Sequence, residues 1–172
     1  MSKLLPRKPV PSLSVSLAPE GEWTLNAEPP EHFTLVVFYR GLHCPVCRKT
    51  LQALNGLVGR FGMIGVSTIA ISCDDADRAR KTKALWSIAH VPLGYGLSID
   101  EARRWGLYIS SAKPGSDEPA LFSEPGVFLV RPDGTLFMAA INSMPFARPH
   151  FEEIADAVEF VIAKNYPARG EA

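Results

Sequence analysis

Two kinds of hydrophobic pattern alternate along this chain. Phe33–Tyr39 and Val66–Ser72 are short apolar runs, which are typical of strands buried inside a sheet. Each run precedes a segment with apolar residues at helical spacing, from Cys47 to about Val58 and from Asp75 to about Ala89. We expect glycines to end the first of these helices, and Asp74 to cap the N-terminus of the second. The strand–helix–strand–helix order predicts parallel strands joined by right-handed crossovers.

The remaining pattern predicts hairpins and two further helices. Alternating residues followed by turn residues predict an N-terminal hairpin (Ser12–Leu17 with Trp23–Leu25) and a later one (Gly126–Arg131 with Thr135–Ile141). Ser98 and Glu101 have the spacing of a capping box for a short helix, and an amphipathic helix is expected after Pro149. Ser110–Glu124, rich in Ser, Pro, Gly and charge, is expected to be a surface loop.

Composition and charge narrow the class of protein. The 172 residues are enough for a single domain, 1–172, with residues 1–10 as a loose N-terminal arm. Lys plus Arg equals Asp plus Glu at 18 each, so no net field favours nucleic acid or an anionic membrane. Prolines interrupt the N-terminus before an apolar segment of a signal peptide can form. Three cysteines do not make a disulfide scaffold, and we expect a cytoplasmic protein.

The candidate chemistry lies in Cys44-Pro45-Val46-Cys47, at a predicted strand-to-helix junction. Unpaired N–H groups and the positive end of the helix dipole favour a thiolate there. Pro45 suits the first helical position, which makes Cys44 the N-cap residue. We therefore expect Cys44 to face outward and Cys47 to be half buried. Arg40 and His43 add local positive charge, which also lowers the pKa of a thiol.

Two other interpretations of these cysteines are less favoured. Half of a zinc site would need a second ligand pair, and the remaining cysteine and histidines are scattered singly. Two buried structural cysteines would not explain the intervening proline and the flanking positive charge. Cys73 follows the second buried strand, so it is expected at the same sheet edge as Arg40, but a lone cysteine more often packs in the core.

Phe38-Tyr39-Arg40-Gly41 followed by Cys-Pro-x-Cys resembles the thioredoxin superfamily. Within it, the stretch is most similar to the peroxiredoxin-like branch of the alkyl hydroperoxide reductase and thiol-specific antioxidant family, and the resemblance covers nearly the whole chain. It implies an α/β thioredoxin-like fold, with a central mixed sheet, flanking helices and an N-terminal β-hairpin extension. It also implies a cis peptide bond before Pro125, at the start of a strand that faces the dithiol, where Pro125 would support the site.

The chain departs from the peroxiredoxin pattern at three positions. In that register the peroxide-attacking cysteine falls on Cys47, the supporting threonine becomes Cys44, and a proline becomes Arg40. The arginine that peroxiredoxins use on the later strand falls on Pro125. Arg40 is therefore a candidate replacement for the missing positive charge.

The register and local physics disagree on which cysteine attacks. Local physics favours Cys44, which is the expected N-cap, lies next to His43 and is expected to be the more exposed thiol. The resemblance favours Cys47, on the apolar face, where desolvation raises a thiol pKa. We expect Cys47 to attack if the substrate is a small peroxide, with Cys44 resolving, and Cys44 to attack if it is a protein disulfide.

The sequence thus predicts a peroxiredoxin-like, thiol-dependent antioxidant oxidoreductase that reduces hydroperoxides through a dithiol/disulfide cycle. The alternatives are a thioredoxin-like protein disulfide reductase without peroxidase activity and a non-catalytic redox-sensing or zinc-holding module. No cofactor or metal is expected. The expected partners are a small hydroperoxide or disulfide substrate, a thiol electron donor of the thioredoxin or glutathione type, and a second copy in a homodimer, without nucleic acid or membrane.

Overall fold

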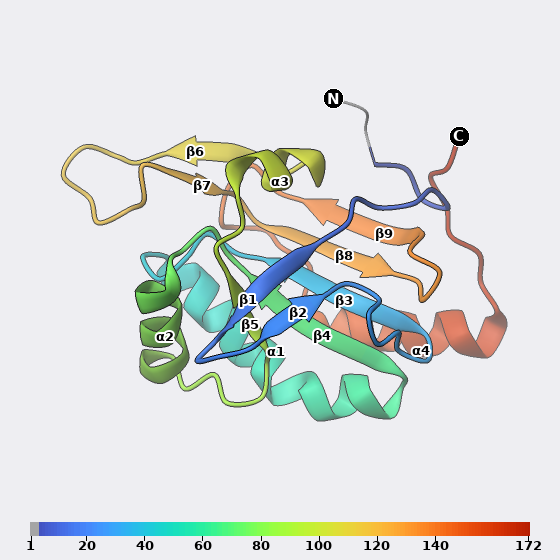
Figure 1. Cartoon of the computed structure of the whole chain (residues 1–172). Coiled ribbons are helices and arrows are strands. Elements are labelled where there is room, and N and C mark those ends of the chain that lie inside the picture. The colour runs from blue at the N-terminus through green and yellow to red at the C-terminus, as the bar shows by residue number, and fades with distance from the viewer. Residues whose placement is uncertain (1–3) are drawn as a thin grey trace.

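The computed structural model describes residues 4–172 and consists of one large sheet, a small two-stranded sheet and four helices (Figure 1). The helices are α1 (Pro45–Met63), α2 (Ala76–Leu85), α3 (Ile99–Arg104) and α4 (Phe151–Lys164). The strands are β1 (Ser14–Ala18), β2 (Glu22–Thr24), β3 (Phe33–Phe38), β4 (Val66–Ile71), β5 (Leu93–Tyr95), β6 (Ile109–Ser111), β7 (Leu121–Ser123), β8 (Gly126–Val130) and β9 (Leu136–Ile141).

The large sheet is mixed, with the strand order β2-β1-β5-β4-β3-β8-β9. β3 is parallel to β4, which is parallel to β5, and the other neighbouring strands are antiparallel. The parallel register pairs Phe38 with Ile71, so β3 and β4 end together at one edge, as the crossover argument predicts. The site residues that follow these two strands are therefore brought to a common edge.

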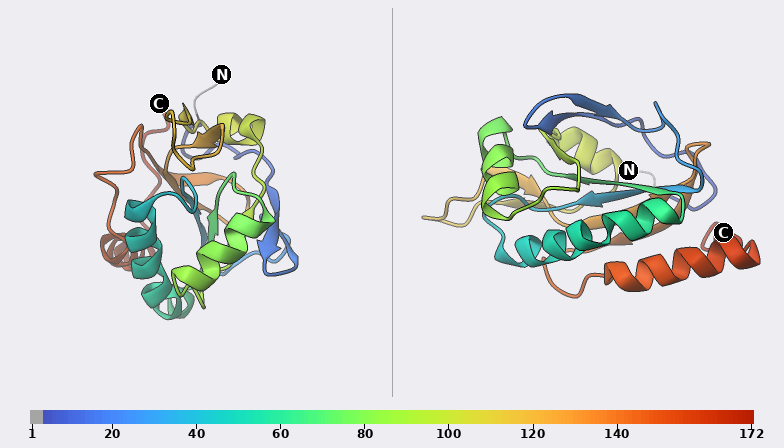
Figure 2. Two further views of the ribbon diagram at one scale, coloured as in Figure 1. Left: turned by 90° about the vertical axis from the view of Figure 1, so that its left-hand side faces the viewer. Right: turned by 90° about the horizontal axis from the view of Figure 1, so that it is seen from below.

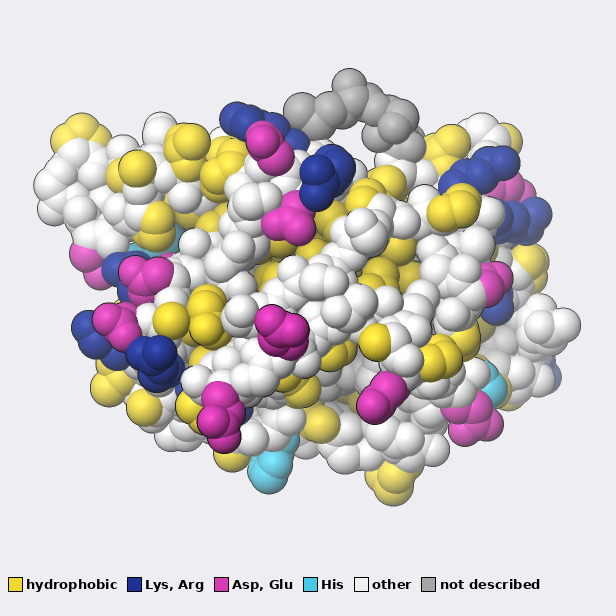
Figure 3. Space-filling view, viewed as in Figure 1, with side chains coloured by type: hydrophobic (Ala, Val, Ile, Leu, Met, Phe, Trp, Pro, Cys, Tyr) yellow, Lys and Arg dark blue, Asp and Glu magenta, His cyan; other side chains and the backbone are white. Residues whose placement is uncertain are grey.

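Helices cover both faces of this sheet, each over its own core (Figure 2). One core lies beneath α1 and α4, where Leu51 and Ile154 pack against Leu35 of β3. The other lies beneath α3, where Ala102 and Trp105 pack with Phe38. The predicted thioredoxin-like fold, a mixed sheet flanked by helices, is confirmed. On the face seen in Figure 3, acidic and basic side chains are interspersed, in keeping with the balanced composition.

The predicted N-terminal hairpin is confirmed, since β1 pairs with β2 and also joins the large sheet through β5. The expected loose arm is wrong where the structure describes it, from residue 4 onward. Arg7 donates its backbone N–H to Leu136 O at 2.8 Å and its Nε–H to Ala168 O at 3.0 Å, and Val10 N–H donates to Gly134 O at 3.0 Å. These bonds tie residues 7–10 to β9 and the C-terminal tail, while residues 1–3 lie outside the described part.

Helix α1 is longer than its glycines suggest and continues to Met63. A glycine costs a helix about 1 kcal/mol relative to alanine, so Gly59 and Gly62 were expected to end it. The buried side chain of Phe61 extends the apolar face past Gly59, and its packing offsets that cost.

Helix α2 begins one residue later and ends earlier than expected. Asp75, rather than Asp74, is the N-cap residue and accepts the backbone N–H of Arg78 at 2.8 Å. The helix ends at Leu85, and Ser87 beyond it has a positive φ of 57°, which a continuing helix does not allow. Asp74 is thereby free for another role, described below.

The segment expected to be a surface loop, Ser110–Glu124, instead contains most of a β-hairpin. β6 and β7 pair antiparallel, and the hairpin projects from the body next to α3 (Figure 1). The other expected elements, including the capping box at Ser98, the β8–β9 hairpin and α4, are confirmed. No helix in residues 4–172 is both long enough and apolar enough to cross a lipid bilayer.

Candidate active site at the start of helix α1

Cys44 is the N-cap residue of α1, as the sequence predicts. Its backbone is extended, Pro45 occupies the first helical turn, and the Cys47 N–H donates to Cys44 Sγ at 3.2 Å. Both cysteines are free thiols. The N-cap geometry therefore directs an unpaired helix donor at the sulfur of Cys44, where it stabilises a thiolate.

Both thiols are buried, and the expectation that Cys44 faces outward is wrong. Cys44 is 1% exposed and Cys47 is not exposed at all. They belong to the core between the sheet and α1, together with Tyr39, and Leu42 of the preceding loop packs against the same core. The helical register gives the direction of a side chain, but not the loops that cover it.

Arg148 is the functional residue that the sequence analysis missed. One of its guanidinium nitrogens, Nη1, lies 3.8 Å from Cys47 Sγ, and the other, Nη2, donates to Thr50 Oγ1 at 2.6 Å. The Thr50 hydroxyl in turn donates to Val46 O at 2.9 Å. A cation is thus held against the dithiol from the segment before α4, at the position of neither Arg40 nor Pro125.

The pKa values of the two thiols are shifted in opposite directions. The pKa of Cys44 is lowered to about 6, chiefly by a hydrogen bond from the Cys47 side chain. The Cys47 N–H and the charges of Arg40 and Arg148 lower this pKa further, whereas burial alone would raise it. Burial raises the pKa of Cys47, and the adjacent Cys44 sulfur raises it further. At neutral pH the negative charge of the pair therefore resides on Cys44, and Cys47 carries the proton.

Asp74 fixes the loop that leads into the dithiol. Its buried carboxylate accepts the Leu42 N–H at 2.8 Å and the Arg78 Nε–H at 2.8 Å. Gly41 has a φ of 133°, and a Cβ at this position would lie 2.7 Å from that carboxylate. Only glycine fits here, both in conformation and in space.

Arg40 is held by the β6–β7 hairpin and not by the thiols. Its guanidinium lies 3.5 Å from a Glu118 oxygen and 3.4 Å from a Glu124 oxygen, and it stacks on the Phe122 ring at 4.8 Å. Both carboxylate side chains are 4% exposed. The charge of Arg40 is therefore largely compensated, although it still contributes to the low pKa of Cys44.

His43 contacts the same hairpin. Its ring meets Phe122 edge to face, with ring centroids 4.7 Å apart, and its Nδ1 lies 3.5 Å from Arg78 Nη2. Burial and the neighbouring Arg40 lower the pKa of His43. At neutral pH His43 is therefore an uncharged side chain, and it does not add the positive charge expected from the sequence.

The peptide bond before Pro125 is trans, so the cis prediction is wrong; among residues 4–172 the cis bond precedes Pro19. The register of β3 with β8 places Pro125 opposite Tyr39, just ahead of the dithiol loop. The residue before it, Glu124, is anchored by two hydrogen bonds: its N–H donates to Tyr108 O at 2.8 Å, and its carboxylate accepts from Ser110 at 2.6 Å.

Cys73 emerges at the same sheet edge as Arg40 but packs against the other core, beneath α3. Burial raises the pKa of its thiol. Its redox role stays a minor alternative, as expected from the sequence. Within residues 4–172, no three Cys, His, Asp or Glu side chains are placed to hold a metal ion.

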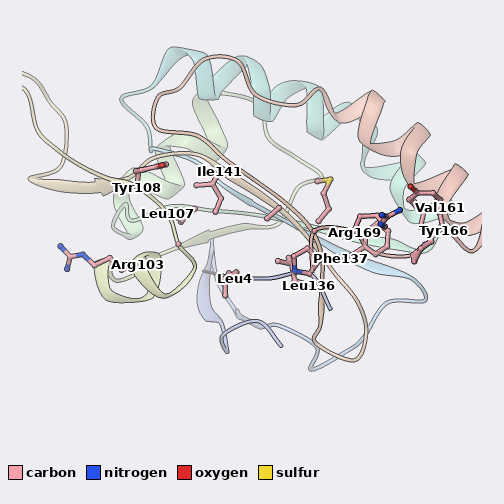
Figure 4. A pocket seen from close by; sticks show the side chains of 16 residues that line it. Leu4, Arg103, Leu107, Tyr108, Leu136, Phe137, Ile141, Val161, Tyr166 and Arg169 are labelled. Atoms are coloured by element: carbon pink, nitrogen blue, oxygen red, sulfur yellow. The ribbon is translucent and has the colours of Figure 1, made fainter. Parts of the chain in front are cut away.

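A large pocket lies apart from the dithiol. It has a volume of about 830 Å³ and wraps around the edge strand β9, with Leu107, Leu136 and Ile141 on its wall and Arg103 and Arg169 at opposite ends (Figure 4). Its apolar wall includes Tyr108, which is 57% exposed. None of the residues that line this pocket contributes to the dithiol site.

A protein-family model described as the AhpC/TSA family matches residues 6–138. No curated protein sequence matches the chain at a significant level. Among solved structures, the chain is similar to the peroxidoxin BcpB from Mycobacterium tuberculosis, with 16% identity over 92% of this chain and 99% of that one and a TM-score of 0.75.

Two further structures are similar over nearly the whole chain. A cysteine-to-serine mutant of peroxiredoxin 6 from Arenicola marina is 18% identical over 95% of this chain and 76% of that one, with a TM-score of 0.77. Reduced Prx3 from Vibrio vulnificus, in complex with hydrogen peroxide, is 12% identical over 91% and 99%, with a TM-score of 0.75. At identities this low, the structural matches show a shared fold and no more. Membership of the family is shown by the family model, which matches most of the chain. The chain belongs to the AhpC/TSA family and is a thiol-dependent oxidoreductase with the thioredoxin-like fold of the peroxiredoxins.

Proposed function

We propose that the protein is a thiol peroxidase that reduces hydroperoxides through a Cys44–Cys47 dithiol/disulfide cycle. The observation that carries this proposal is the burial of both sulfurs, with Cys44 1% and Cys47 0% exposed. A protein disulfide needs an accessible sulfur for an in-line attack, whereas a peroxide of a few atoms can enter a recessed site. Membership of the AhpC/TSA family supports the same choice.

The charge distribution supports Cys44 as the attacking thiolate, the reverse of the order that the resemblance implies. The Cys44 sulfur attacks the terminal oxygen of the hydroperoxide, the O–O bond breaks, and the alkoxide leaves as an alcohol after taking a proton. Cys44 becomes a sulfenic acid. The Cys47 sulfur then attacks Cys44 Sγ and gives up its proton, water leaves, and a disulfide forms.

Arg148 and Arg40 have different roles in this cycle. Arg148 lies against Cys47 Sγ and is placed to stabilise negative charge on the reacting oxygen and on Cys47 as it loses its proton. Arg40 acts at longer range by favouring the Cys44 thiolate. His43 and Pro125 remain proposed supporting residues, through the Phe122 contact and the position opposite Tyr39.

A protein disulfide reductase is the second candidate, and one observation favours it. A lowered pKa on the first cysteine and a raised pKa on the second suit an enzyme that forms a mixed disulfide and then resolves it. Burial of Cys44 opposes this candidate, because a bulky partner cannot reach the sulfur in the described conformation.

The deciding experiment mixes reduced protein with one equivalent of hydrogen peroxide and follows oxidation by intact mass and peptide mapping. We expect a Cys44–Cys47 disulfide in the wild type and a trapped sulfenic acid on Cys44 in Cys47→Ser. Slow oxidation by every peroxide, together with rapid reduction of a protein disulfide such as insulin, would assign the second function. A disulfide that includes Cys73 would overturn the proposed cycle, and metal analysis of the purified protein tests the zinc-holding alternative.

The electron donor is proposed to be a thiol of the thioredoxin or glutathione type, working in the reducing cytoplasm. We also propose a homodimer, with the apolar wall around β9 as the shared surface. The exposed apolar side chains of Tyr108 and Ile141 support this placement.

A further inference from the structure

Thr50, in the second turn of α1, is the side chain that holds Arg148. Arg148 Nη2 donates to Thr50 Oγ1 at 2.6 Å, and the Thr50 hydroxyl donates to Val46 O, four residues earlier in the helix, at 2.9 Å. Because a hydroxyl has a single proton and two acceptor lone pairs, this second bond leaves only lone pairs to face the guanidinium. The helix therefore presents Thr50 as an oriented acceptor for Arg148.

Thr50 holds the guanidinium without neutralising it. Among residues 4–172, Arg148 forms no ion pair, whereas Arg40 lies against the carboxylates of Glu118 and Glu124. A carboxylate in place of the Thr50 hydroxyl would bind the guanidinium more strongly, but its negative charge would compensate the cation. Because the holding group is neutral, the charge of Arg148 remains available to the Cys47 sulfur, which lies 3.8 Å from Nη1.

The sulfur beside Arg148 is the harder of the two to ionise. Burial and the adjacent Cys44 sulfur raise the pKa of Cys47, and the charge of Arg148 opposes them. In the proposed cycle Cys44 is a thiolate from the start, whereas Cys47 must lose its proton to attack the sulfenic acid. The placement of Arg148 therefore matters most in the second step of the cycle.

We propose that Thr50 is a positioning residue for this resolving step, an inference that rests on the proposed dithiol cycle. Thr50 holds Arg148 against Cys47, and the guanidinium stabilises the sulfur as the S–H proton leaves. The Cys47 sulfur attacks Cys44 Sγ, the S–S bond forms, the S–O bond of the sulfenic acid breaks, and the proton leaves with the hydroxide as water. Thr50 and Arg148 are unchanged by the step.

The test follows the two steps of the cycle separately. Reduced protein is mixed with one equivalent of hydrogen peroxide and quenched in acid over a time series. Intact mass then distinguishes the sulfenic acid, which has gained an oxygen, from the disulfide, which has lost two hydrogens, and peptide mapping confirms the residues. The rate of the second step is therefore obtained independently of the first.

Three substitutions separate positioning from a general effect on the helix. Thr50→Val keeps the shape of the side chain but removes the acceptor, and Thr50→Ser keeps the hydroxyl. Gln52→Leu is the matched control, because it removes a hydrogen bond between α1 and Trp86 O, at 3.1 Å, that does not involve Arg148. Thr50→Val is also combined with Arg148→Gln, since a residue that acts through Arg148 has no further effect once the guanidinium is gone.

We expect Thr50→Val to convert the sulfenic acid to the disulfide about tenfold more slowly than the wild type, the factor for losing one hydrogen bond to a charged group. Thr50→Ser and Gln52→Leu should stay close to the wild-type rate, and Thr50→Val should cause no further slowing in the Arg148→Gln protein. A wild-type rate of resolution in Thr50→Val, equal slowing in Thr50→Ser or Gln52→Leu, or a second tenfold loss on top of Arg148→Gln would overturn this inference alone. Failure of hydrogen peroxide to yield a Cys44–Cys47 disulfide in the wild type would overturn the proposed function and this inference with it.

Discussion

The assignment of the thiolate to Cys44 can be tested by separating the two cysteines. Cys47→Ser keeps a side chain that can donate a hydrogen bond to Cys44 Sγ, and it leaves the backbone N–H of residue 47 in place. Cys44→Ser leaves Cys47 alone in its buried position, where desolvation raises its pKa. The two variants should therefore differ in the pH at which the remaining thiol becomes reactive.

The expected difference follows from the fraction of thiolate. With a pKa of about 6, Cys44 reactivity in Cys47→Ser should rise about tenfold from pH 5 to pH 7 and only about 10% more by pH 9. Cys47 reactivity in Cys44→Ser should instead rise about tenfold with every pH unit and reach no plateau below about pH 9. The shapes of the two profiles are thus distinct.

The assay is the rate of alkylation by iodoacetamide, a reagent small enough for a recessed site, across a pH series with intact-mass detection. Cys73 is replaced by serine in all variants, so that one thiol is followed in each. A plateau near pH 7 in Cys44→Ser would place the thiolate on Cys47 and refute the reasoning. A profile of Cys73→Ser with both Cys44 and Cys47 in place that lacks an inflection between about pH 5 and pH 7 would refute it as well.

Three further predictions concern the surroundings of the dithiol and the β9 surface. In stopped-flow measurements, Arg148→Gln should slow oxidation by hydrogen peroxide about tenfold, the effect of losing one charge-assisted contact. Arg148→Lys should recover part of the rate. Equal rates in the wild type and both variants would exclude a role of Arg148 in the reaction. Gly41→Ala should lower the free energy of unfolding in urea by about 2 kcal/mol or more, because its Cβ would lie 2.7 Å from the Asp74 carboxylate. Gly59→Ala, in an open helical position, should instead raise the free energy of unfolding by about 0.5 to 1 kcal/mol. Equal effects of the two substitutions would contradict this packing. Ile141→Lys should shift a dimer toward monomer in sedimentation experiments at several protein concentrations, and an unchanged distribution would exclude this strand as the interface.

The dithiol itself could be predicted because its geometry is local. A strand end, a proline in the first helical turn and two cysteines three residues apart determine the N-cap and the hydrogen bond to Cys44 Sγ. The burial of Cys44 could not be predicted in the same way, since it depends on packing in the core with Tyr39 and Leu42.

Arg148 could not be found from the sequence, because it is 101 residues from Cys47 and lies in a segment without periodicity. The one available signal was a basic residue within the apolar, proline-containing stretch Met144–Pro149. The composition of Ser110–Glu124, rich in Ser, Pro and Gly, led to the wrong prediction of a loop. The segment forms most of a hairpin whose side chains Glu118, Phe122 and Glu124 contact Arg40. In both segments the structure depends on contacts with residues far away in the sequence, and local propensity carries no information about such contacts.

The low pKa of Cys44 also sets the thermodynamics of recycling. At pH 7, a pKa of about 6 instead of the higher value of an ordinary thiol stabilises the reduced protein by about 1 kcal/mol, since the thiolate exists only in that form. For a two-electron couple a stabilisation of this order raises the reduction potential by a few tens of millivolts, since about 30 mV corresponds to about 1.4 kcal/mol. The proposed Cys44–Cys47 disulfide would therefore be a better electron acceptor than a disulfide between two ordinary thiols. In the proposed cycle, access to the two buried sulfurs would therefore select among thiol donors.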